Sequence, residues 1–403
     1  MHPAEILANT MRRIYDAGLT SVSGGNISYL DDEGTLWITP SGTDKAALSA
    51  DQIVCVRPDG RMEGKFKPSV ELPFHQLVYK LRPDVRMVVH AHPPLASAFA
   101  IARKPVDVSC LPDAQALCNS MGMAGYDLPG SASLGEKVAY AFAEGHDSVL
   151  LESHGLAVVG TSAEDAFGRL ERLEALAHTL LMVKRLGGAP VAPIALPKAQ
   201  YAPVLPAVPC NEIHETLAVL TRRAHRKGLI QMLSGTFSQR CGKGFVILKQ
   251  SADRACAAAE DMVYVEGAQC ETGKTPDASA ALHAQIYAAH PEIHSVCTAC
   301  PPSASAYLLT DKPFPPVMLS ESHIVLRAVA AADSVDEAIE KLAPNQPIVL
   351  LRGGCVITTA AKPFTAFDRL EVLDMTALSS ALAPGDAFLL TDEEKHDIEQ
   401  KFW

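Results

Sequence analysis

The sequence lacks long apolar runs, an excess of basic residues and a dense array of cysteines, and each of these absences excludes a class of protein. No stretch of about 18 apolar residues is present, so we expect no membrane partner. Lys and Arg number 35 against 46 Asp and Glu, a net charge of −11, which argues against nucleic acid as a partner. The ten cysteines are scattered. Together with an N-terminal stretch that has no signal-peptide core, this predicts a cytoplasmic protein.

The length and composition allow more than one folded domain. The chain has 403 residues, of which 48% are hydrophobic, enough for two or three domains. Residues 188–210 contain six prolines and predict an extended linker. This linker separates a first predicted domain at residues 1–187 from a second at residues 211–403.

The two halves are related in sequence. VVHAHPPLASAF, from Val88, aligns with VCTACPPSASAY, from Val296, and seven of the twelve positions are identical. Three further pairs match in the same order, namely GLTSVSGGNIS with GLIQMLSGTFS, PFHQLVY with ALHAQIY, and VLLESHGLAVV with VLLRGGCVITT. Four matches in one order indicate the duplication of a whole domain, since the period is far too long for a solenoid.

Within the first repeat, the hydrophobic pattern predicts helices that flank a central sheet. Helices are expected at residues 3–17, 69–81, 94–101 and 162–185. Strands are expected at residues 25–29, 36–39, 53–56, 87–91, 149–152 and 156–159.

His90 and His92 are the first candidate metal ligands. Side chains two apart on a strand point to the same face, so the two imidazoles at the end of the apolar strand 87–91 are presented together. Zinc binds imidazole nitrogen readily, which makes a metal site one interpretation. A pair of exposed histidines at the end of a strand is the other.

The second half separates these two interpretations. The scaffold motifs persist there, whereas four positions change together: His90, His92, His154 and Glu71 correspond to Thr298, Cys300, Gly354 and Ser279. If the histidines were structural, the second copy should need them too. The simpler hypothesis is a metal site in the first half only. Three neutral histidines leave a coordination position open, which is typical of a catalytic metal.

Three segments are candidates for binding an anion, and one carboxylate lies in a position to assist. Small residues at 23–26 and 39–43 form loops that can aim backbone N–H groups at a phosphate, and Ser69 begins a predicted helix. Glu71, in the first turn of that helix, could ligate the metal or act as a base. It could equally be an acidic residue that the helix dipole favours.

Taken together, the motifs SGGNIS, ITPSG, KPSVELPFH, VVHAHPP and ESHGL resemble the class II aldolase/adducin family, which includes fuculose-1-phosphate aldolases. The second half keeps the frame of these motifs without the ligands. The resemblance implies an α/β fold, a three-layer α/β/α sandwich with a mostly antiparallel central sheet, duplicated in tandem. It also implies Zn²⁺, or another divalent metal such as Mn²⁺ or Co²⁺, held by His90, His92 and His154.

The resemblance assigns further roles. It implies that Glu71 takes a proton from the carbon next to a ketone, and that phosphate contacts fall to Gly25, Asn26, Ser41, Gly42 and Ser69. Family members that act on phosphorylated sugars often have two hydroxyl residues before the acid. Here the second is Val70, so the substrate could be a phosphorylated ketose, a free sugar or a keto acid.

The resemblance also suggests a role for the second half. Family aldolases are usually fourfold rings with sites at subunit interfaces, so two tandem domains predict a homodimer that mimics the ring. Glu321 and His323 lie in the stretch where family aldolases supply a proton donor from a neighbouring subunit, and they are candidates for a cross-domain acid.

These patterns predict a zinc-dependent lyase that reversibly cleaves a small ketose, ketose phosphate or hydroxy-keto acid through a metal-stabilised enediolate. An epimerase, dehydratase or decarboxylase of the same family is the first alternative, although Glu rather than Asp at position 71 favours aldol cleavage. A non-catalytic, adducin-like binding protein is the second, and the intact histidine set of the first half argues against it.

Overall fold

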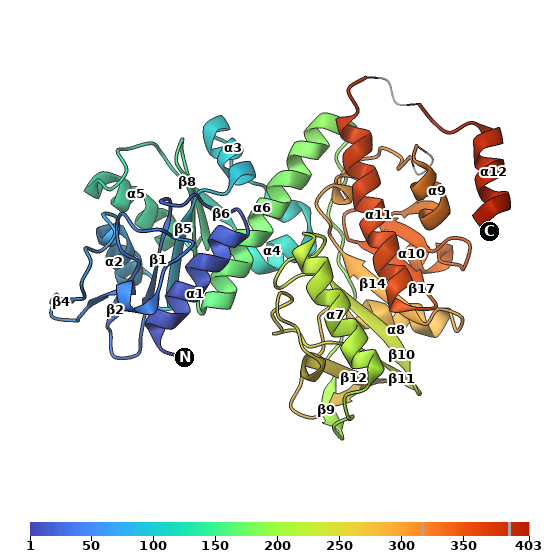
Figure 1. Cartoon of the computed structure of the whole chain (residues 1–403), viewed down its shortest axis with the longest axis horizontal. Coiled ribbons are helices and arrows are strands. Elements are labelled where there is room, and N and C mark those ends of the chain that lie inside the picture. Colours follow the sequence, from blue (N-terminus) through green and yellow to red (C-terminus); the bar gives the residue numbers. More distant parts are fainter. Residues whose placement is uncertain (316–317, 386–387, 403) are drawn as a thin grey trace. The chain divides into compact units, whose positions relative to one another are not determined.

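The computed structural model describes residues 1–315, 318–385 and 388–402, and the chain forms two compact units (Figure 1). The first unit comprises Met1–Ser109 and Asp113–His178, and the second comprises Cys110–Pro112 and Thr179–Trp403. Each unit has a sheet of its own.

The first unit contains eight strands and the helices that cover them. In chain order its elements are α1 (Pro3–Asp16), β1 (Asn26–Leu30), β2 (Leu36–Ile38), η1 (Ala50–Gln52), β3 (Val54–Val56), β4 (Met62–Glu63), α2 (Leu72–Leu81), β5 (Met87–Ala91), α3 (Pro94–Ala102), η2 (Val108–Cys110), α4 (Pro112–Cys118), β6 (Met121–Ala124), α5 (Ala132–Ala143), β7 (Ser148–Leu151), β8 (Gly155–Gly160) and α6 (Ala163–Leu186), which continues beyond the unit.

The sheet of the first unit is mostly antiparallel. Its strand order is β4-β3-β2-β1-β5-β8-β7-β6, and β6 with β7 is its one parallel pair among the described residues. The central strand β5 is buried along its whole length because it lies between β1 and β8. Helices α2 and α5 cover one face and α1 and α6 the other (Figure 1). The main core lies between the sheet and the α2–α5 pair.

Local sequence explains where the elements begin and end. Helix α1 starts with Pro3 in its first turn, and the His2 side chain and Glu5 form a capping box before it. Gly18, at φ +71°, follows its end, where a residue without a β-carbon is favoured. The strands β5 and β8 are rich in valine and alanine, and both are buried.

The second unit repeats this plan. Its elements are β9 (Ala202–Leu205), α7 (Glu212–Arg226), β10 (Thr236–Cys241), β11 (Gly244–Leu248), η3 (Ala259–Asp261), β12 (Met262–Glu266), β13 (Gln269–Glu271), α8 (Ala280–Ala289), β14 (Ser295–Ala299), η4 (Ala304–Leu308), α9 (Ser320–Leu326), β15 (Val329–Ala332), α10 (Val335–Lys341), β16 (Ile348–Leu351), β17 (Val356–Ala360), α11 (Pro363–Leu382) and α12 (Asp392–Phe402).

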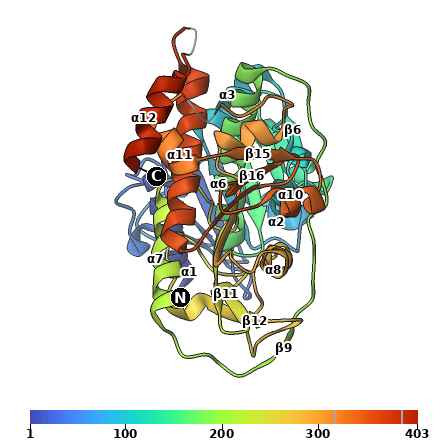
Figure 2. The same ribbon diagram turned by 90° about the vertical axis from the view of Figure 1, so that its right-hand side faces the viewer.

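The order of the strands confirms the predicted duplication. The second sheet runs β15-β16-β17-β14-β10-β11-β12-β13-β9. Its first eight strands match those of the first sheet read in the opposite direction, from β6 to β4, and β9 is added after them. The parallel pair β15–β16 stands where β6–β7 stands in the first unit. Figure 2 shows α7 and α11 on one side of this sheet and α8 and α10 on the other. Each half is therefore the predicted three-layer sandwich.

The additional strand comes from the proline-rich segment. Residues 202–205 form β9, which pairs in parallel with β13 at the edge of the second sheet. The backbone N–H groups of Val191 and Ile194 donate to Leu309 and Gly353 of the same unit. The segment that the prolines predict as a linker is thus extended, and it runs along the second unit to β9 (Figure 2).

The start of α2 differs from the expectation. The helix begins at Leu72 rather than at Ser69, and Glu71 is the residue before its first turn. Ser69 and Glu71 lie in a turn that the Leu72 N–H closes by donating to the Ser69 carbonyl. The short strands β4 and β6 and the helices α4 and α5 were not among the expected elements.

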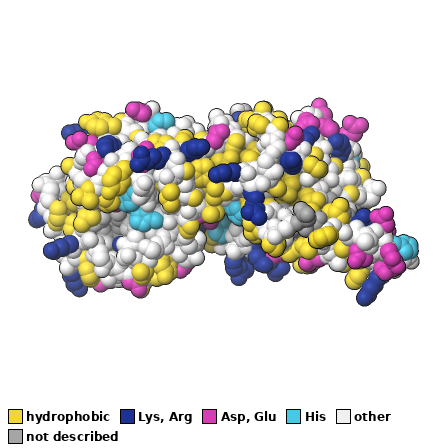
Figure 3. Space-filling view, turned by 90° about the horizontal axis from the view of Figure 1, so that it is seen from above, with side chains coloured by type: hydrophobic (Ala, Val, Ile, Leu, Met, Phe, Trp, Pro, Cys, Tyr) yellow, Lys and Arg dark blue, Asp and Glu magenta, His cyan; other side chains and the backbone are white. Residues whose placement is uncertain are grey.

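The surface carries charges of both signs. On the face seen in Figure 3, the described Lys and Arg side chains are interspersed with Asp and Glu and do not form one broad basic patch. None of the helices within the described residues has the length and apolar character to cross a membrane.

Candidate metal centre

Strand β5 positions the first two histidines. His90 pairs with Asn26 of β1 on one side and with Ala157 of β8 on the other, so the backbone around it is fixed on both edges. His92 follows directly after the strand, before Pro93 and the start of α3. The two Nε2 atoms lie 3.2 Å apart, as the two-residue spacing predicts.

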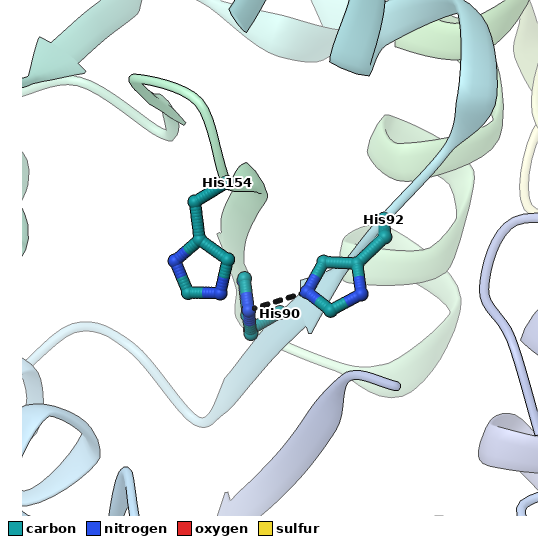
Figure 4. A group of neighbouring side chains, drawn as sticks. All are labelled: His90, His92 and His154. Carbon is teal, nitrogen blue, oxygen red and sulfur yellow. Dashed lines mark hydrogen bonds between the residues drawn. The ribbon is translucent and has the colours of Figure 1, made fainter. Parts of the chain in front are cut away.

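The turn between β7 and β8 brings the third histidine to the same place. Ser153 adopts a left-handed conformation, with φ 54°, and the N–H of His154 donates to the Leu151 carbonyl. The ring of His154 then lies 4.7 Å from that of His90 and 5.3 Å from that of His92, between centroids. One nitrogen from each of the three rings lies within 4.8 Å of the others, and the rings face a common point (Figure 4).

Two glycines make room for the ring of His92. A β-carbon at Gly24 would lie 2.8 Å from Nδ1 of His92, and one at Gly155 would lie 2.7 Å from its Cδ2 and 2.6 Å from the Ala91 carbonyl. These separations are closer than van der Waals contact, so larger residues would displace the ring. The small-residue loop and the His-Gly pair of the sequence therefore serve the packing of the histidines.

The surroundings keep the imidazoles neutral. Burial lowers the pKa of His90 to about 4, and it also lowers the pKa values of His92 and His154. Nδ1 of His90 lies 3.1 Å from the Leu156 carbonyl, which can only accept, so the proton is on Nδ1 and Nε2 is free to coordinate.

The donor set fits a divalent metal. Three neutral imidazoles that converge from two loops and a strand are ligands that zinc accepts. Figure 4 shows Nε2 of His154 directed toward the rings of His90 and His92, so Nε2 is the atom of this ring that would coordinate a metal. No other cluster of three such ligands occurs in the part of the chain that the structure describes.

Glu71 lies at the edge of this cluster. Its Oε2 is 3.5 Å from Nε2 of His90 and accepts a 2.6 Å hydrogen bond from the side-chain amide of Asn26. Burial acts to raise the pKa of Glu71, whereas the hydrogen bond from Asn26 favours the charged form, and the pKa is lowered. An ionised carboxylate therefore lies within reach of the point where the histidines meet.

The structure brings some of the predicted phosphate residues together around Glu71. Gly25, at φ +70°, passes so close to the His90 carbonyl that a β-carbon would lie 2.7 Å from it. Ser69 accepts a 3.2 Å hydrogen bond from the Glu71 N–H. The side-chain amide of Asn26 donates one N–H to the Glu71 carboxylate, and its part in binding an anion stays a prediction.

Ser41 and Gly42 are exposed on the neighbouring loop. The Ser41 N–H donates to the Lys67 carbonyl, and the Ser69 N–H donates to the Thr39 carbonyl, so this loop is bound to the segment that precedes Glu71. Gly42 has a φ of +66°, which favours glycine.

The two candidates for a cross-domain acid lie on α9 of the second unit. Glu321 is exposed, and His323 is buried, with Nε2 3.1 Å from a carboxylate oxygen of Glu399 on α12. Their role stays a prediction.

Sequence reasoning missed a buried group behind Glu71. Nδ1 of His75 lies 2.6 Å from the Ser28 hydroxyl, which is 2.9 Å from the Tyr79 hydroxyl, and Nε2 of His75 lies 2.5 Å from Oδ1 of Asn26. The signal was present in the repeats. Ser28, His75 and Tyr79 recur in the second half as Ser238, His283 and Tyr287.

Comparison with known proteins identifies a family for both halves. The sequence matches the family described as Class II Aldolase and Adducin N-terminal domain over residues 5–181 and again over residues 215–379. A 5-methylthioribulose-1-phosphate/5-deoxyribulose-1-phosphate aldolase of Rhodospirillum rubrum is 33% identical over 172 residues, 43% of this chain and 77% of the relative. An L-fuculose phosphate aldolase of Methanococcus maripaludis is 29% identical over 173 residues, 43% of this chain and 93% of the relative. A solved L-fuculose 1-phosphate aldolase is 28% identical, with a TM-score of 0.42, and the match covers 48% of this chain and 90% of that one.

Proposed function

The chain belongs to the class II aldolase and adducin family through both of its halves, and on that premise we propose that its first half is a metal-dependent carbon–carbon lyase. It would reversibly cleave a small ketose, ketose phosphate or hydroxy-keto acid. The observation that carries the proposal is the convergence of three neutral imidazoles and one ionised carboxylate in the first half.

His90, His92 and His154 would hold the metal, with Glu71 beside it. Zinc is the metal that three imidazoles favour, and Mn²⁺ or Co²⁺ are alternatives. When bound, a divalent cation would polarise the carbonyl of the substrate and favour the loss of a proton from the adjacent carbon. The hydrogen bond from His90 Nδ1 to the Leu156 carbonyl would orient that ring toward the metal.

Glu71 would move the proton. Its carboxylate is ionised in the folded protein, because its pKa is lowered, and it is therefore ready to accept a proton near neutral pH. The bond from Asn26 holds the carboxylate in one orientation, and this carboxylate would take the proton from the substrate carbon. In the reverse direction the same group would return it.

The relatives suggest the class of substrate. The names of the two matched aldolases describe phosphorylated ketoses as what those enzymes act on. For this chain we propose that Gly25, Asn26, Ser41, Gly42 and Ser69 contact the anionic end of the substrate. Val70, which is two-thirds exposed, offers no hydroxyl to such a group.

Hydrogen exchange at the substrate carbon tests this function directly. The zinc-loaded protein would be incubated in deuterated water with dihydroxyacetone phosphate, dihydroxyacetone or pyruvate, and proton NMR would follow the loss of hydrogen next to the carbonyl. We expect exchange with at least one of the three probes. We also expect Glu71→Gln to lower the rate by about 10²–10⁴-fold, a typical contribution of a general base.

Ser279→Ala is the matched control, since Ser279 occupies the position of Glu71 in the second half and has no proposed role. It should leave the exchange rate unchanged. Bound metal, measured by mass spectrometry, should stay near one ion per chain in both variants. Absence of exchange with all three probes, or equal rates in Glu71→Gln and the wild type, would contradict the proposed lyase.

The predicted homodimer is a separate part of the proposal. It follows from two tandem domains in place of two subunits. A solution mass equal to that of one 43.0 kDa chain would exclude it.

A further inference from the structure

A chain of hydrogen bonds leads through the core of the first unit to Glu71. It begins at the Tyr79 hydroxyl, 2.9 Å from that of Ser28, and continues over 2.6 Å to Nδ1 of His75. Nε2 of His75 lies 2.5 Å from Oδ1 of Asn26, and Nδ2 of Asn26 lies 2.6 Å from Oε2 of Glu71. Every bond joins atoms of buried residues, so water does not compete for them.

The chemistry of the groups fixes the direction of these bonds. Oδ1 of Asn26 can only accept, so Nε2 of His75 carries the proton and donates it. A neutral imidazole has one N–H, and burial lowers the pKa of His75 to about 3, so Nδ1 is an acceptor. The Ser28 hydroxyl then donates to Nδ1. From Ser28 onward the donors therefore point along the chain toward the carboxylate, whereas the Tyr79 hydroxyl donates to the main-chain carbonyl of Ser28, 2.9 Å away.

This direction determines the orientation of the Asn26 amide. With its oxygen held by His75, the amide presents its NH₂ group to Glu71. If the amide turned over, its oxygen would face the carboxylate, and its NH₂ group would face an N–H donor. Both contacts would be repulsive.

The second unit contains the same serine, histidine and tyrosine, but its histidine bonds to a different residue. Nδ1 of His283 lies 2.7 Å from the Ser238 hydroxyl, which is 2.8 Å from the Tyr287 hydroxyl. Nε2 of His283 lies 2.9 Å from the Thr298 hydroxyl, and no asparagine or carboxylate follows, since Thr236 and Ser279 stand in those places. The buried histidine is thus a shared part of the fold, and only the first copy connects it to a reactive group.

We propose that His75 is a positioning residue for the reaction: it holds the amide of Asn26 in the orientation that donates to Glu71, and so fixes the orientation of the Glu71 carboxylate. This inference rests on the proposed function, because it gives Glu71 the role of base. Among the described residues, the ring of His75 bonds to Ser28 and Asn26 and makes no hydrogen bond to His90, His92 or His154. The loss of such an orienting partner typically lowers activity about 10–100-fold.

Two substitutions at one position separate positioning from packing. In His75→Gln the terminal NH₂ can reach Asn26 as Nε2 does. In His75→Asn the shorter side chain keeps an acceptor for Ser28 but cannot reach Asn26. The matched control is His283→Asn, which makes the same change in the second unit.

We expect the exchange rate with dihydroxyacetone phosphate to fall about 10–100-fold in His75→Asn, with little change in KM and with bound zinc unchanged. His75→Gln should recover most of the rate, and His283→Asn should retain all of it. A merely structural role predicts instead that His75→Asn and His283→Asn behave alike, and that outcome would overturn the proposal.

A second readout requires neither metal nor activity. The side-chain amide protons of Asn26 can be followed by NMR in metal-free protein labelled with ¹⁵N-asparagine, and assigned by their absence in Asn26→Asp. They should shift in His75→Asn and keep their place in His75→Gln and His283→Asn. Unchanged resonances in His75→Asn would also overturn the proposal.

The two readouts distinguish the two possible failures. If the wild type exchanges no probe, the proposed function fails, and the Asn26 resonances still decide whether His75 orients the amide. If the wild type exchanges the probe and His75→Asn does so equally, only the role of His75 fails. Should His75→Asn not fold, Ser28→Ala, with Ser238→Ala as its control, removes the donor that fixes the proton on Nε2.

Discussion

The two halves of the chain share a fold and a buried network but differ at the positions of the candidate metal ligands. Both sheets have the same order of eight strands, and the same serine, histidine and tyrosine join the central strands to the helix that covers them. The three histidines and the glutamate are confined to the first half. The second half therefore keeps the fold and the network without the metal ligands.

The backbone around the ligands has changed with them. Gly24 and Gly155 leave space for the ring of His92, and the second half has Ser234 and Cys355 in their places, where Cys300 replaces the ring. Once no imidazole had to fit, residues with a β-carbon could enter. The glycines of the first half are thus part of the site rather than general features of the turns.

A buried cation marks a second difference. Lys45 and Arg254 occupy the same position after the second strand of each sheet, and both are almost fully buried. Arg254 forms a 2.5 Å ion pair with Asp277, whose counterpart in the first half is Ser69. Nζ of Lys45 donates to the Pro40 carbonyl, 3.0 Å away. The second half has therefore placed a carboxylate where the first half has one of its predicted phosphate residues.

The largest expected effect comes from removing one ligand and its counterpart. We expect His92→Ala to lose the bound metal and to lower hydrogen exchange by at least about 10³-fold, because the metal and its charge stabilisation are lost together. Cys300→Ala, at the same position of the second half, should keep one ion per chain and the full rate. Metal analysis and exchange with dihydroxyacetone phosphate measure both. A second ion, lost in Cys300→Ala, would show that the halves are not divided as we propose.

Much of this comparison could be predicted from the sequence, because it depends on local patterns. The apolar run before His90 fixes a strand, and a two-residue spacing then places His90 and His92 on one face. The duplicated motifs fixed the correspondence of His154 with Gly354, and the order of the strands agrees with it. The helix predicted at residues 162–185 is α6, and its bounds differ by one residue at each end.

The rest depends on contacts that no local pattern encodes. Asn26 is an expected anion ligand in a small-residue loop, but its amide bonds to Glu71 because β1 and the turn before α2 meet in space. Helix α2 begins at Leu72 and not at the predicted Ser69, because residues 69–72 form a turn in which the Leu72 N–H donates to the Ser69 carbonyl. His75 was overlooked because a single histidine on an apolar helix face is usually a packing residue, and only its partners show otherwise.

An intermediate effect should follow from breaking the ion pair that is present only in the second half. In Asp277→Ser the position becomes like Ser69, and the Arg254 guanidinium, which is 1% exposed, loses its carboxylate. Leaving one partner of a buried pair uncompensated costs about 3–5 kcal/mol. Urea denaturation should show a correspondingly lower free energy of unfolding.

Ser69→Ala is the control for this substitution, because it removes a hydroxyl that accepts one hydrogen bond. It should cost about 1 kcal/mol. Equal effects of the two substitutions would mean that the ion pair with Asp277 does not stabilise the fold. The hydrogen bonds from Arg254 to the carbonyls of Gly235 and Ala252 would then be enough to compensate its buried charge.

The smallest effect concerns the histidine that both halves retain. Burial lowers the pKa of His283 to about 4, against the opposing charge of Asp277, so this histidine is neutral in the folded protein. In the unfolded chain, with a pKa near its usual value of about 6.5, it gains a proton as the pH falls. Its contribution to stability is therefore complete above about pH 6.5 and is lost between about pH 6.5 and 4, by up to about 1.4 kcal/mol per pH unit.

His283→Gln removes that proton uptake, so its free energy of unfolding should depend less on pH than that of the wild type, although it is less stable at pH 7. Urea titrations at pH 7, 6 and 5 in the presence of a chelator measure the difference without interference from a metal. His75 has a pKa lowered to about 3 by the same burial, so His75→Gln should flatten the acid dependence as well. If the free energy of unfolding depended on pH in the same way in the wild type and both variants, burial would not hold the shared histidines neutral. The two cores would then share an arrangement of residues but not this pKa shift.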